Sequence, residues 1–230
     1  MSRGYINPEN ILNHCVTLSD VGELLYKLRV RIGHELRNLP GLIQLRFCLE
    51  LIQKASNEGR FKSIRQGPVD GKGVPLPWLT PSSIYYLNNL DISEKRMLEF
   101  GAGHSTVWFS HKVRDILSFE CSEIWISVLR QRFQYNGKIQ LVDEDFDGSD
   151  IDFSTADLVL VDGLDRTGIL NNIIFSLDTG TRIELLIIDN PEFINDLTLT
   201  RLDSYFHRID FVGVANGSWQ STTTTIMIPK

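Results

Sequence analysis

The sequence lacks long hydrophobic runs. No stretch of the 230 residues approaches the roughly 18 consecutive apolar residues that a membrane-spanning helix needs, so we expect no membrane span. The first 20 residues contain no apolar core of the kind that signal peptides carry, so we expect no secretory leader. Cysteine is scarce: Cys15, Cys48 and Cys121 are odd in number and show no Cys-x-x-Cys spacing. This usage excludes a disulfide framework or a cysteine-based zinc site and is typical of reduced thiols in a cytoplasmic protein.

Basic residues are also few relative to acidic ones. The chain has 23 Lys and Arg against 29 Asp and Glu, for a net charge of −6. This balance argues against nucleic acid as the main partner. The contents of 42% hydrophobic and 23% charged residues are ordinary for a globular protein. The length accommodates one large domain, or one domain with an N-terminal extension.

The N-terminal region has a helical pattern. Apolar residues recur at helical spacing over residues 21–32 and again over 42–52, and Pro40-Gly41 separates the two stretches. The basic side chains of this region form either a solvated face or a surface for an acidic substrate or partner. They are Lys27, Arg29, Arg31, Arg37 and Arg46.

A change of composition marks a domain boundary. Residues 61–81 are rich in glycine and proline, which predicts a loop. We therefore divide the chain into a helical extension and linker, residues 1–77, and a core domain, residues 78–230. Trp78, at the start of the core domain, is expected to pack on the core, with the wall of a substrate site as the alternative.

Strands and helices alternate from residue 96 onward. Strands are predicted near 96–100, 115–120, 139–142, 157–162, 184–189, 208–214 and 223–229. Helices are predicted at the start of the core domain, from Pro81, and near 105–113, 123–134, 167–177 and 191–206. This alternation is typical of an α/β, doubly wound, mostly parallel sheet with helices on both faces. The short connection Asn216-Gly217-Ser218 before the last strand favours an antiparallel C-terminal strand pair.

The most informative stretch is Met97-Leu-Glu-Phe-Gly-Ala-Gly-His-Ser-Thr106. An apolar strand runs into Gly101-x-Gly103, where the backbone can turn sharply and approach a ligand, and a helix follows whose N-terminus offers free N–H groups. The next predicted strand ends in Glu120, 19 residues after Gly101. A carboxylate at the tip of the neighbouring strand is where a ribose is held in nucleotide sites. These features predict a nucleoside-binding site.

Over residues 78–230 the chain resembles the class I S-adenosylmethionine-dependent methyltransferases. The matching residues are Glu99-Phe-Gly-Ala-Gly-His-Ser-Thr106, Glu120, Asp157-Leu-Val-Leu-Val-Asp162-Gly163 and Leu186-Ile-Ile-Asp189-Asn190. The Glu-Phe-Gly-x-Gly-x-Ser-Thr-x-Trp form is similar to a group of bacterial methyltransferase-like proteins without a known substrate. The resemblance implies a Rossmann-like seven-stranded sheet ending in an antiparallel pair, and S-adenosyl-L-methionine as cofactor.

The resemblance also implies roles for single residues. Gly101 and Gly103, with Ala102, His104 and Ser105, would lie against the methionine part of the cofactor. Glu99 would orient the turn or contact the amino group, and Glu120 would accept hydrogen bonds from both ribose hydroxyls. Asp162 would face the site of methyl transfer. In the acidic stretch 143–152, Asp143 or Glu144 would accept a hydrogen bond from the adenine amine; the alternative is a solvated loop.

Asp162, Asp189 and Asn190 also suggest a metal site. Their oxygens would converge at one edge of a parallel sheet and suit Mg²⁺ or Ca²⁺. The pattern resembles the metal site of catechol-type and caffeoyl-CoA-type O-methyltransferases, where the metal lowers the pKa of a substrate hydroxyl. Those enzymes carry a lysine base where this chain has Arg166, which stays charged and would clamp a substrate carboxylate or phosphate. The alternative is that the aspartates cap the following segments.

The expected function is therefore methyl transfer to an oxygen of a small or sugar-like acceptor, with Asp162 and Arg166 as catalytic candidates. His104 would be a base only if it reached the acceptor, and lining the cofactor site is the alternative. The N-terminal helices would cap the active site or mediate homodimer formation. Two other functions remain open: a non-catalytic protein that keeps the cofactor pocket, and a nicotinamide-dependent oxidoreductase, whose Gly-x-Gly-x-x-Gly fingerprint would have Thr106 at its third glycine.

Overall fold

The computed structural model describes residue 27 and residues 40–230. The helix expected over 21–32 therefore lies outside the described residues apart from Lys27, as do Arg29, Arg31 and Arg37. Within the described part, no helix is both long and apolar enough to cross a bilayer.

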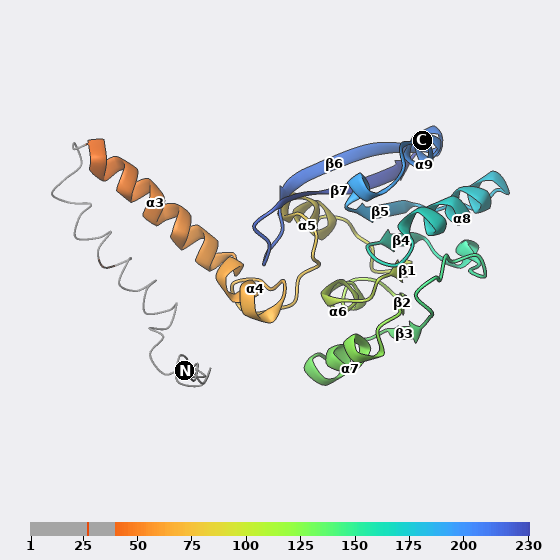
Figure 1. Ribbon diagram of the computed structural model, residues 1–230, viewed down its shortest axis with the longest axis horizontal. Coiled ribbons are helices and arrows are strands. Elements are labelled where there is room, and N and C mark those ends of the chain that lie inside the picture. Colours follow the sequence, from red (N-terminus) through yellow and green to blue (C-terminus); the bar gives the residue numbers. More distant parts are fainter. Residues whose placement is uncertain (1–26, 28–39) are drawn as a thin grey trace, which may run out of the picture.

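Within residues 40–80, the structure describes two helices ahead of the core sheet. Helix α3, Pro40–Asn57, projects away from the sheet, and α4, Arg60–Gln66, follows it (Figure 1). The expectation of a loop from residue 61 is thus wrong for α4. Its sequence Arg-Phe-Lys-Ser-Ile-Arg-Gln contains no glycine or proline, and the chain turns at the flanking glycines, Gly59 and Gly67, both with positive φ. Beyond Gly67 the chain runs as the expected loop up to α5.

The core domain is built on one seven-stranded sheet. The strands are β1 Arg96–Phe100, β2 Asp115–Glu120, β3 Lys138–Leu141, β4 Leu158–Val161, β5 Leu185–Asp189, β6 Phe206–Val214 and β7 Ser221–Pro229. Their order in the sheet is β3-β2-β1-β4-β5-β7-β6. The pairs from β3 to β5 are parallel, and β7 pairs antiparallel with both β5 and β6. The fold predicted from the sequence is confirmed: a Rossmann-like, mostly parallel sheet with an antiparallel C-terminal pair.

Helices connect the strands and cover both faces of the sheet (Figure 1). They are α5 Pro81–Asn88, α6 His104–Ser110, α7 Glu123–Arg132, α8 Arg166–Asp178 and α9 Asp196–Tyr205, with short 3-10 helices η1 Phe153–Thr155 and η2 Pro191–Phe193. The single helix expected over 191–206 is divided into η2 and α9. Asn190 is left-handed, with φ 54°, and Asn195 caps α9 by accepting a hydrogen bond from the Thr198 N–H.

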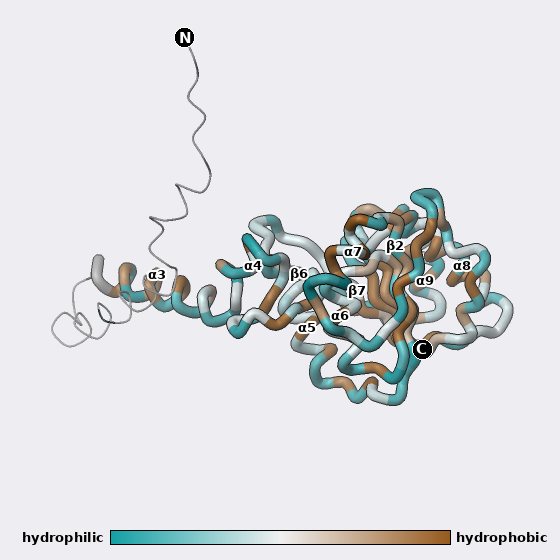
Figure 2. The backbone as a smooth tube through the Cα atoms, turned by 90° about the horizontal axis from the view of Figure 1, so that it is seen from below, coloured by the Kyte–Doolittle hydropathy of each residue, from teal (hydrophilic) through white to brown (hydrophobic). Residues whose placement is uncertain are grey.

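The core has two layers because strand side chains alternate between the faces of the sheet. In β4, Val159 and Val161 pack on the face covered by α8 and α9, while Leu158 and Leu160 pack on the face covered by α5 and α6. The hydrophobic colouring of the sheet in Figure 2 follows this buried centre. Trp108 lies in the second layer and is buried, as expected.

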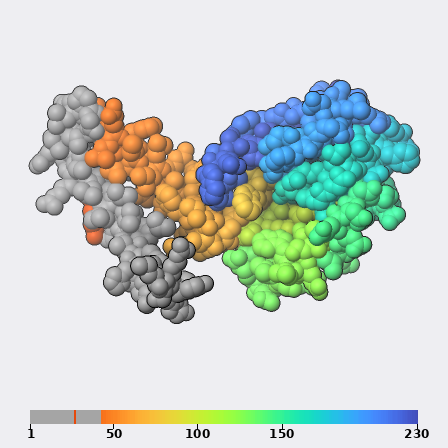
Figure 3. Space-filling view, viewed as in Figure 1, coloured from red at the N-terminus to blue at the C-terminus, as the bar shows by residue number. Residues whose placement is uncertain are grey.

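The strand order positions the site. The chain moves outward from β1 to β3 and then returns to place β4 on the other side of β1. In such sheets the carboxyl ends of the strands beside this reversal leave a crevice for ligands. Polar contacts hold residues 58–69, which include α4, next to the same edge of the sheet. Asn216 Nδ2 donates to the carbonyl oxygens of Glu58 and Val69, and Arg60 donates to the Val214 carbonyl. Figure 3 shows the β6–β7 turn beside this segment.

Candidate functional site

The turn after β1 is held against the loop after β4. Gly101 has φ +100° and donates its N–H to the Phe119 carbonyl, while the Gly163 N–H donates to the Phe100 carbonyl. A Cβ atom at Gly101 would lie 2.7 Å from the Gly163 nitrogen, closer than real side chains come. Both the positive φ and the close approach therefore require glycine at position 101.

Glu99 lies under this turn and is fully buried. Its Oε2 atom accepts hydrogen bonds from the hydroxyls of Thr106 and Ser118, so it joins β1 to α6 and β2. The Thr106 hydroxyl in turn accepts from the Gly103 N–H. Burial raises the pKa of Glu99 from 4.5 to about 7, and its Oε1 atom has no hydrogen-bond partner. Glu99 does not line the pocket above the turn, so its contacts support the turn from below.

A pocket of about 320 Å³ opens over the turn, and we call it the glycine pocket. Its lining includes Gly101, Ala102, Gly103, His104, Ser105, Glu120 and Asp162, all predicted as site residues. Glu120 Oε1 accepts a hydrogen bond from the Ser122 N–H, which orients the carboxylate at the tip of β2. Sequence reasoning missed Trp125, which also lines the pocket and donates its indole N–H to the Ala102 carbonyl.

His104 is a fixed lining residue. Its Nε2 atom donates to the Gln66 carbonyl oxygen at 3.2 Å, and the ring packs edge-on against Phe133. Burial lowers its pKa, so the imidazole is neutral near pH 7. The ring therefore links the turn to the end of α4, which fits the lining role rather than that of a base.

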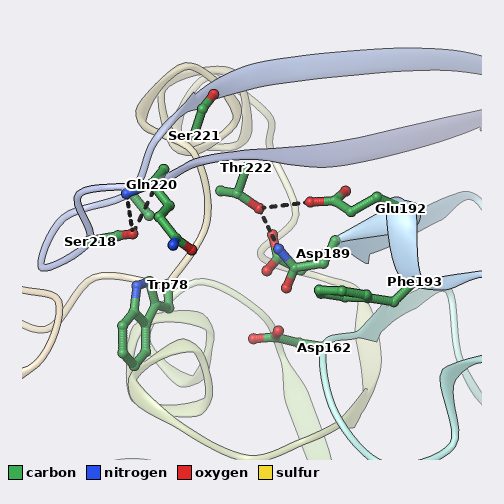
Figure 4. Close-up of a pocket in the computed structure, with 11 residues that line it drawn as sticks. Trp78, Asp162, Asp189, Glu192, Phe193, Ser218, Gln220, Ser221 and Thr222 are labelled. Carbon is green, nitrogen blue, oxygen red and sulfur yellow. Dashed lines mark hydrogen bonds between the residues drawn. The ribbon is translucent and has the colours of Figure 1, made fainter.

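A second pocket of about 350 Å³ adjoins the first, and we call it the acidic pocket. Trp78 and Asp162 line both pockets. Figure 4 shows the carboxylate of Asp162 between Trp78 and Phe193, with Asp189 and Glu192 on the same side of the pocket as Phe193. The other lining residues come largely from the β6–β7 turn and the start of β7: Ala215, Ser218, Gln220, Ser221 and Thr222. Trp78 is 53% exposed, so the expectation that it packs on the core is wrong, and the alternative, a wall residue, fits.

Asp162 and Asp189 both line the acidic pocket, and their carboxyl groups influence each other's pKa. Burial and the charge of Asp189 raise the pKa of Asp162 well above 3.8, although Arg166 opposes this. Burial likewise raises the pKa of Asp189 to about 6, against a hydrogen bond from the Thr224 hydroxyl. Two neighbouring carboxyl groups with raised pKa values favour sharing one proton over carrying two charges.

Arg166 contacts Asp162 in this structure. Its Nη2 atom donates to the Asp162 carbonyl oxygen and lies 3.5 Å from Asp162 Oδ1. Arg166 is not among the residues lining either pocket. Its role as a clamp for a substrate anion stays a prediction.

The three predicted metal ligands come together at the acidic pocket, but the Asn190 amide donates to the Thr222 hydroxyl. In the part of the chain that the structure describes, no group of three or more His, Cys, Asp or Glu side chains is arranged to hold a metal ion. Metal binding at Asp162, Asp189 and Asn190 stays a prediction.

Asp143 and Glu144 are exposed and do not line the glycine pocket. Their contact with an adenine also stays a prediction. The residues that sequence reasoning missed come from segments without a motif: Gly67 and Pro68 from the loop, and Phe193 and Gln220 beside the last strands. The one signal in the sequence is the proline-rich stretch before Pro81, because it contains an aromatic residue, Trp78, next to the predicted core domain.

No family model and no curated protein sequence matches the chain. Among solved structures, a dimethyladenosine transferase from Plasmodium falciparum is similar with a TM-score of 0.47 and 16% identity, over 66% of this chain and 63% of that one. An rRNA methylase from Streptococcus thermophilus has a TM-score of 0.46 and 14% identity, over 64% and 94%. The tRNA (m1A58) methyltransferase TrmI from Aquifex aeolicus has a TM-score of 0.45 and 16% identity, over 65% and 68%.

The matched region spans less than two thirds of the Plasmodium protein. At these identities, the assignment of the fold rests on the strand order of the sheet itself. The three proteins are methyltransferases, as the resemblance implies, but none is named as a catechol-type or caffeoyl-CoA-type enzyme.

The expected partners need correction. We expected a small-molecule acceptor and excluded nucleic acid from the net charge of −6. That expectation is wrong, because the similar structures include enzymes named for rRNA and tRNA methylation. The physical reason is that net charge sums over the whole surface, whereas binding depends on the local potential where the partner lies.

Proposed function

We propose that this chain is an S-adenosylmethionine-dependent methyltransferase whose cofactor lies in the glycine pocket. The observation that carries the proposal is a convergence at the reversal of strand order. A glycine turn that tolerates no Cβ at Gly101, the oriented carboxylate of Glu120 and the carboxylate of Asp162 meet at one pocket. A nucleoside joined to an amino acid needs this set: close backbone approach, a diol acceptor and an acceptor for an ammonium group.

The residues divide the binding task. Glu120 would accept the ribose hydroxyls, while Trp125, fixed by its bond to the Ala102 carbonyl, walls the same side of the pocket. Gly101, Gly103 and Ser105, which line the pocket around the start of α6, would lie against the polar amino-acid end, and Glu99 supports this turn through Thr106. When bound, the cofactor supplies a methyl group on a positively charged sulfur.

The chain's own contribution to the reaction is placement and proton transfer. Asp162 lines both pockets, so an acceptor in the acidic pocket would meet the cofactor at this residue. Alignment of the two reactants supplies a large part of the rate in such a displacement. The Asp162–Asp189 pair, with its raised pKa values, is suited to take up a proton from the acceptor near neutral pH.

Calorimetric titration with S-adenosylhomocysteine tests this proposal. We expect binding in the micromolar range and a loss of at least about tenfold in Glu120→Ala, because two hydrogen bonds to a charged group are removed. Glu123→Ala is the matched control, since this exposed carboxylate lies nearby at the start of α7 and outside the pocket.

The same titration separates the alternatives. Absence of binding would refute the proposal, and binding of NADH in its place would favour the oxidoreductase. Tight binding without turnover on any acceptor would favour a non-catalytic protein. A titration repeated with Mg²⁺ tests the predicted ligands Asp162, Asp189 and Asn190, because occupancy of that site should change the heat of binding in the wild type and not in Asp189→Asn.

A further inference from the structure

The acidic pocket has a shape and a chemistry that the proposed cofactor site does not explain. Two large aromatic side chains stand in it with much of their surface free: Trp78 is 53% exposed and Phe193 is 73% exposed. Figure 4 shows them on opposite sides of the pocket, with the carboxylate of Asp162 between them. Exposed aromatic faces on both sides of a cavity suit a flat ring, which stacks, or a cation, which is attracted to the ring electrons.

The polar groups of the pocket are all acidic or neutral. Asp162, Asp189 and Glu192 line it, and none of its lining residues is Lys, Arg or His. Arg166 contacts Asp162 from outside the lining, so with one proton shared between Asp162 and Asp189 the group keeps a net charge of −1. A group with several N–H donors and a positive charge would satisfy these carboxylates, whereas a phosphate or carboxylate would be repelled by them.

This lining distinguishes nitrogen from oxygen acceptors. A protonated amine offers up to three donors and a charge, and a hydroxyl offers one donor and none. Glu192 already accepts a hydrogen bond from the Thr222 hydroxyl, and Asp189 accepts one from the Thr224 hydroxyl. The acceptor positions that remain on these carboxyl groups outnumber the single hydrogen bond that one hydroxyl could donate. The set is therefore matched to an amine rather than to a hydroxyl.

We propose that the acidic pocket binds the methyl acceptor through a protonated amine joined by a short alkyl chain to a flat ring, and that the amine nitrogen is the atom methylated. This inference rests on the proposed function, because the methyl group must come from the glycine pocket. The inference concerns the amine and the ring of the methyl acceptor. The rest of the acceptor molecule would be recognised by surfaces outside the pocket.

Atoms and charges balance in this step. The ammonium group first loses one proton to the surrounding water, which frees the nitrogen lone pair. The lone pair then forms the N–CH₃ bond as the S–CH₃ bond breaks, and the electron pair of that bond stays on sulfur. The positive charge of the sulfonium thus moves to the methylated nitrogen, which the carboxylates stabilise. No other reactant is needed.

Tryptamine and tryptophol are suitable probes, because they share an indole ring and differ in carrying an amine or a hydroxyl. Both are titrated into the full-length protein, with and without S-adenosylhomocysteine. We expect tryptamine to bind at least about tenfold more tightly, as hydrogen bonds to charged groups predict. Glu192→Gln should reduce this preference, and Phe193→Ala should weaken both probes to a similar degree. Glu94→Gln, an exposed carboxylate at the opposite end of the sheet, is the control and should change neither.

Tryptamine with S-adenosylmethionine is then examined by mass spectrometry for an added methyl group on nitrogen. Such a product, with the preference described, supports the inference. Equal binding of the two probes, no binding of tryptamine, or an unchanged preference in Glu192→Gln would overturn it. Tryptamine that binds but gains no methyl group would overturn nitrogen as the reacting atom. Failure of the proposed function is seen separately, as loss of S-adenosylhomocysteine binding.

Discussion

Replacement of Gly101 by alanine tests how the site is built. Gly101 has φ +100°, and its missing Cβ would lie 2.7 Å from the Gly163 nitrogen and 2.8 Å from the Gly163 Cα. Both neighbours are backbone atoms of the loop after β4, so they cannot rotate away as a side chain would. The alanine must either push the two loops apart or force the turn into another conformation.

The expected cost follows from these two effects. Alanine at a positive φ loses about 1–2 kcal/mol. Forcing a methyl group into a closed space costs about 1–3 kcal/mol. The reduced freedom of the unfolded chain returns about 0.4–1 kcal/mol. We therefore expect Gly101→Ala to lower the free energy of unfolding by about 2–4 kcal/mol.

Urea unfolding followed by circular dichroism measures this loss. Gly103→Ala is the matched control, because Gly103 has an extended φ of −167° and its added Cβ would meet only Ser105 Oγ, at an ordinary 3.6 Å. We expect it to change stability by less than about 1 kcal/mol. Equal losses in the two variants, or a negligible loss in Gly101→Ala, would show that the contact between the loops after β1 and β4 does not restrict the turn.

Three further predictions concern stability. Glu99 has a pKa raised from 4.5 to about 7, so its protonated form favours the folded state. The resulting stability is complete below about pH 4.5 and is lost as the pH rises through 7; Glu99→Gln should flatten this decline in urea unfolding curves measured across the range, and an unchanged slope would contradict the assignment. Leu160→Ala, in the buried centre of β4, should cost about 2–5 kcal/mol by urea unfolding, whereas Ile64→Ala, 69% exposed on α4, should cost less than about 0.5 kcal/mol. Asn216→Ala removes two hydrogen bonds to backbone carbonyls of the N-terminal segment, so hydrogen exchange should speed up in α4 and not in β1, and uniform protection would refute that anchoring.

The sequence was sufficient for the elements that depend on local patterns. The runs that end in Glu99-Phe100, Glu120 and Asp189 are apolar and short, and each became a strand close to its predicted bounds. Gly101 and Glu120 meet at one pocket because carboxyl ends of parallel strands share one edge of the sheet. Alternation of strands and helices and a short final connection were therefore enough to predict the sheet and its antiparallel end.

Local pattern also failed in identifiable places. The glycine and proline content of residues 61–81 masked α4, whose seven residues contain neither. Residues 191–206 look like one helix, but the left-handed Asn190 and the capping Asn195 divide them. In both places the residues at the boundaries decided where a helix begins and ends, against the average composition of the segment.

By itself, the sequence determined the positions of the strands, the glycine turn and the carboxylates at the strand ends, because these follow from hydrophobic periodicity and from the conformations open to glycine. Only the tertiary structure decided which of these groups meet. It exposed Trp78 across the pocket from Phe193, placed Asp162 and Asp189 on one pocket, and turned Arg166 onto Asp162. Such contacts join residues far apart in the chain, and they depend on how the loops after different strands pack across the edge of the sheet, which no local pattern records.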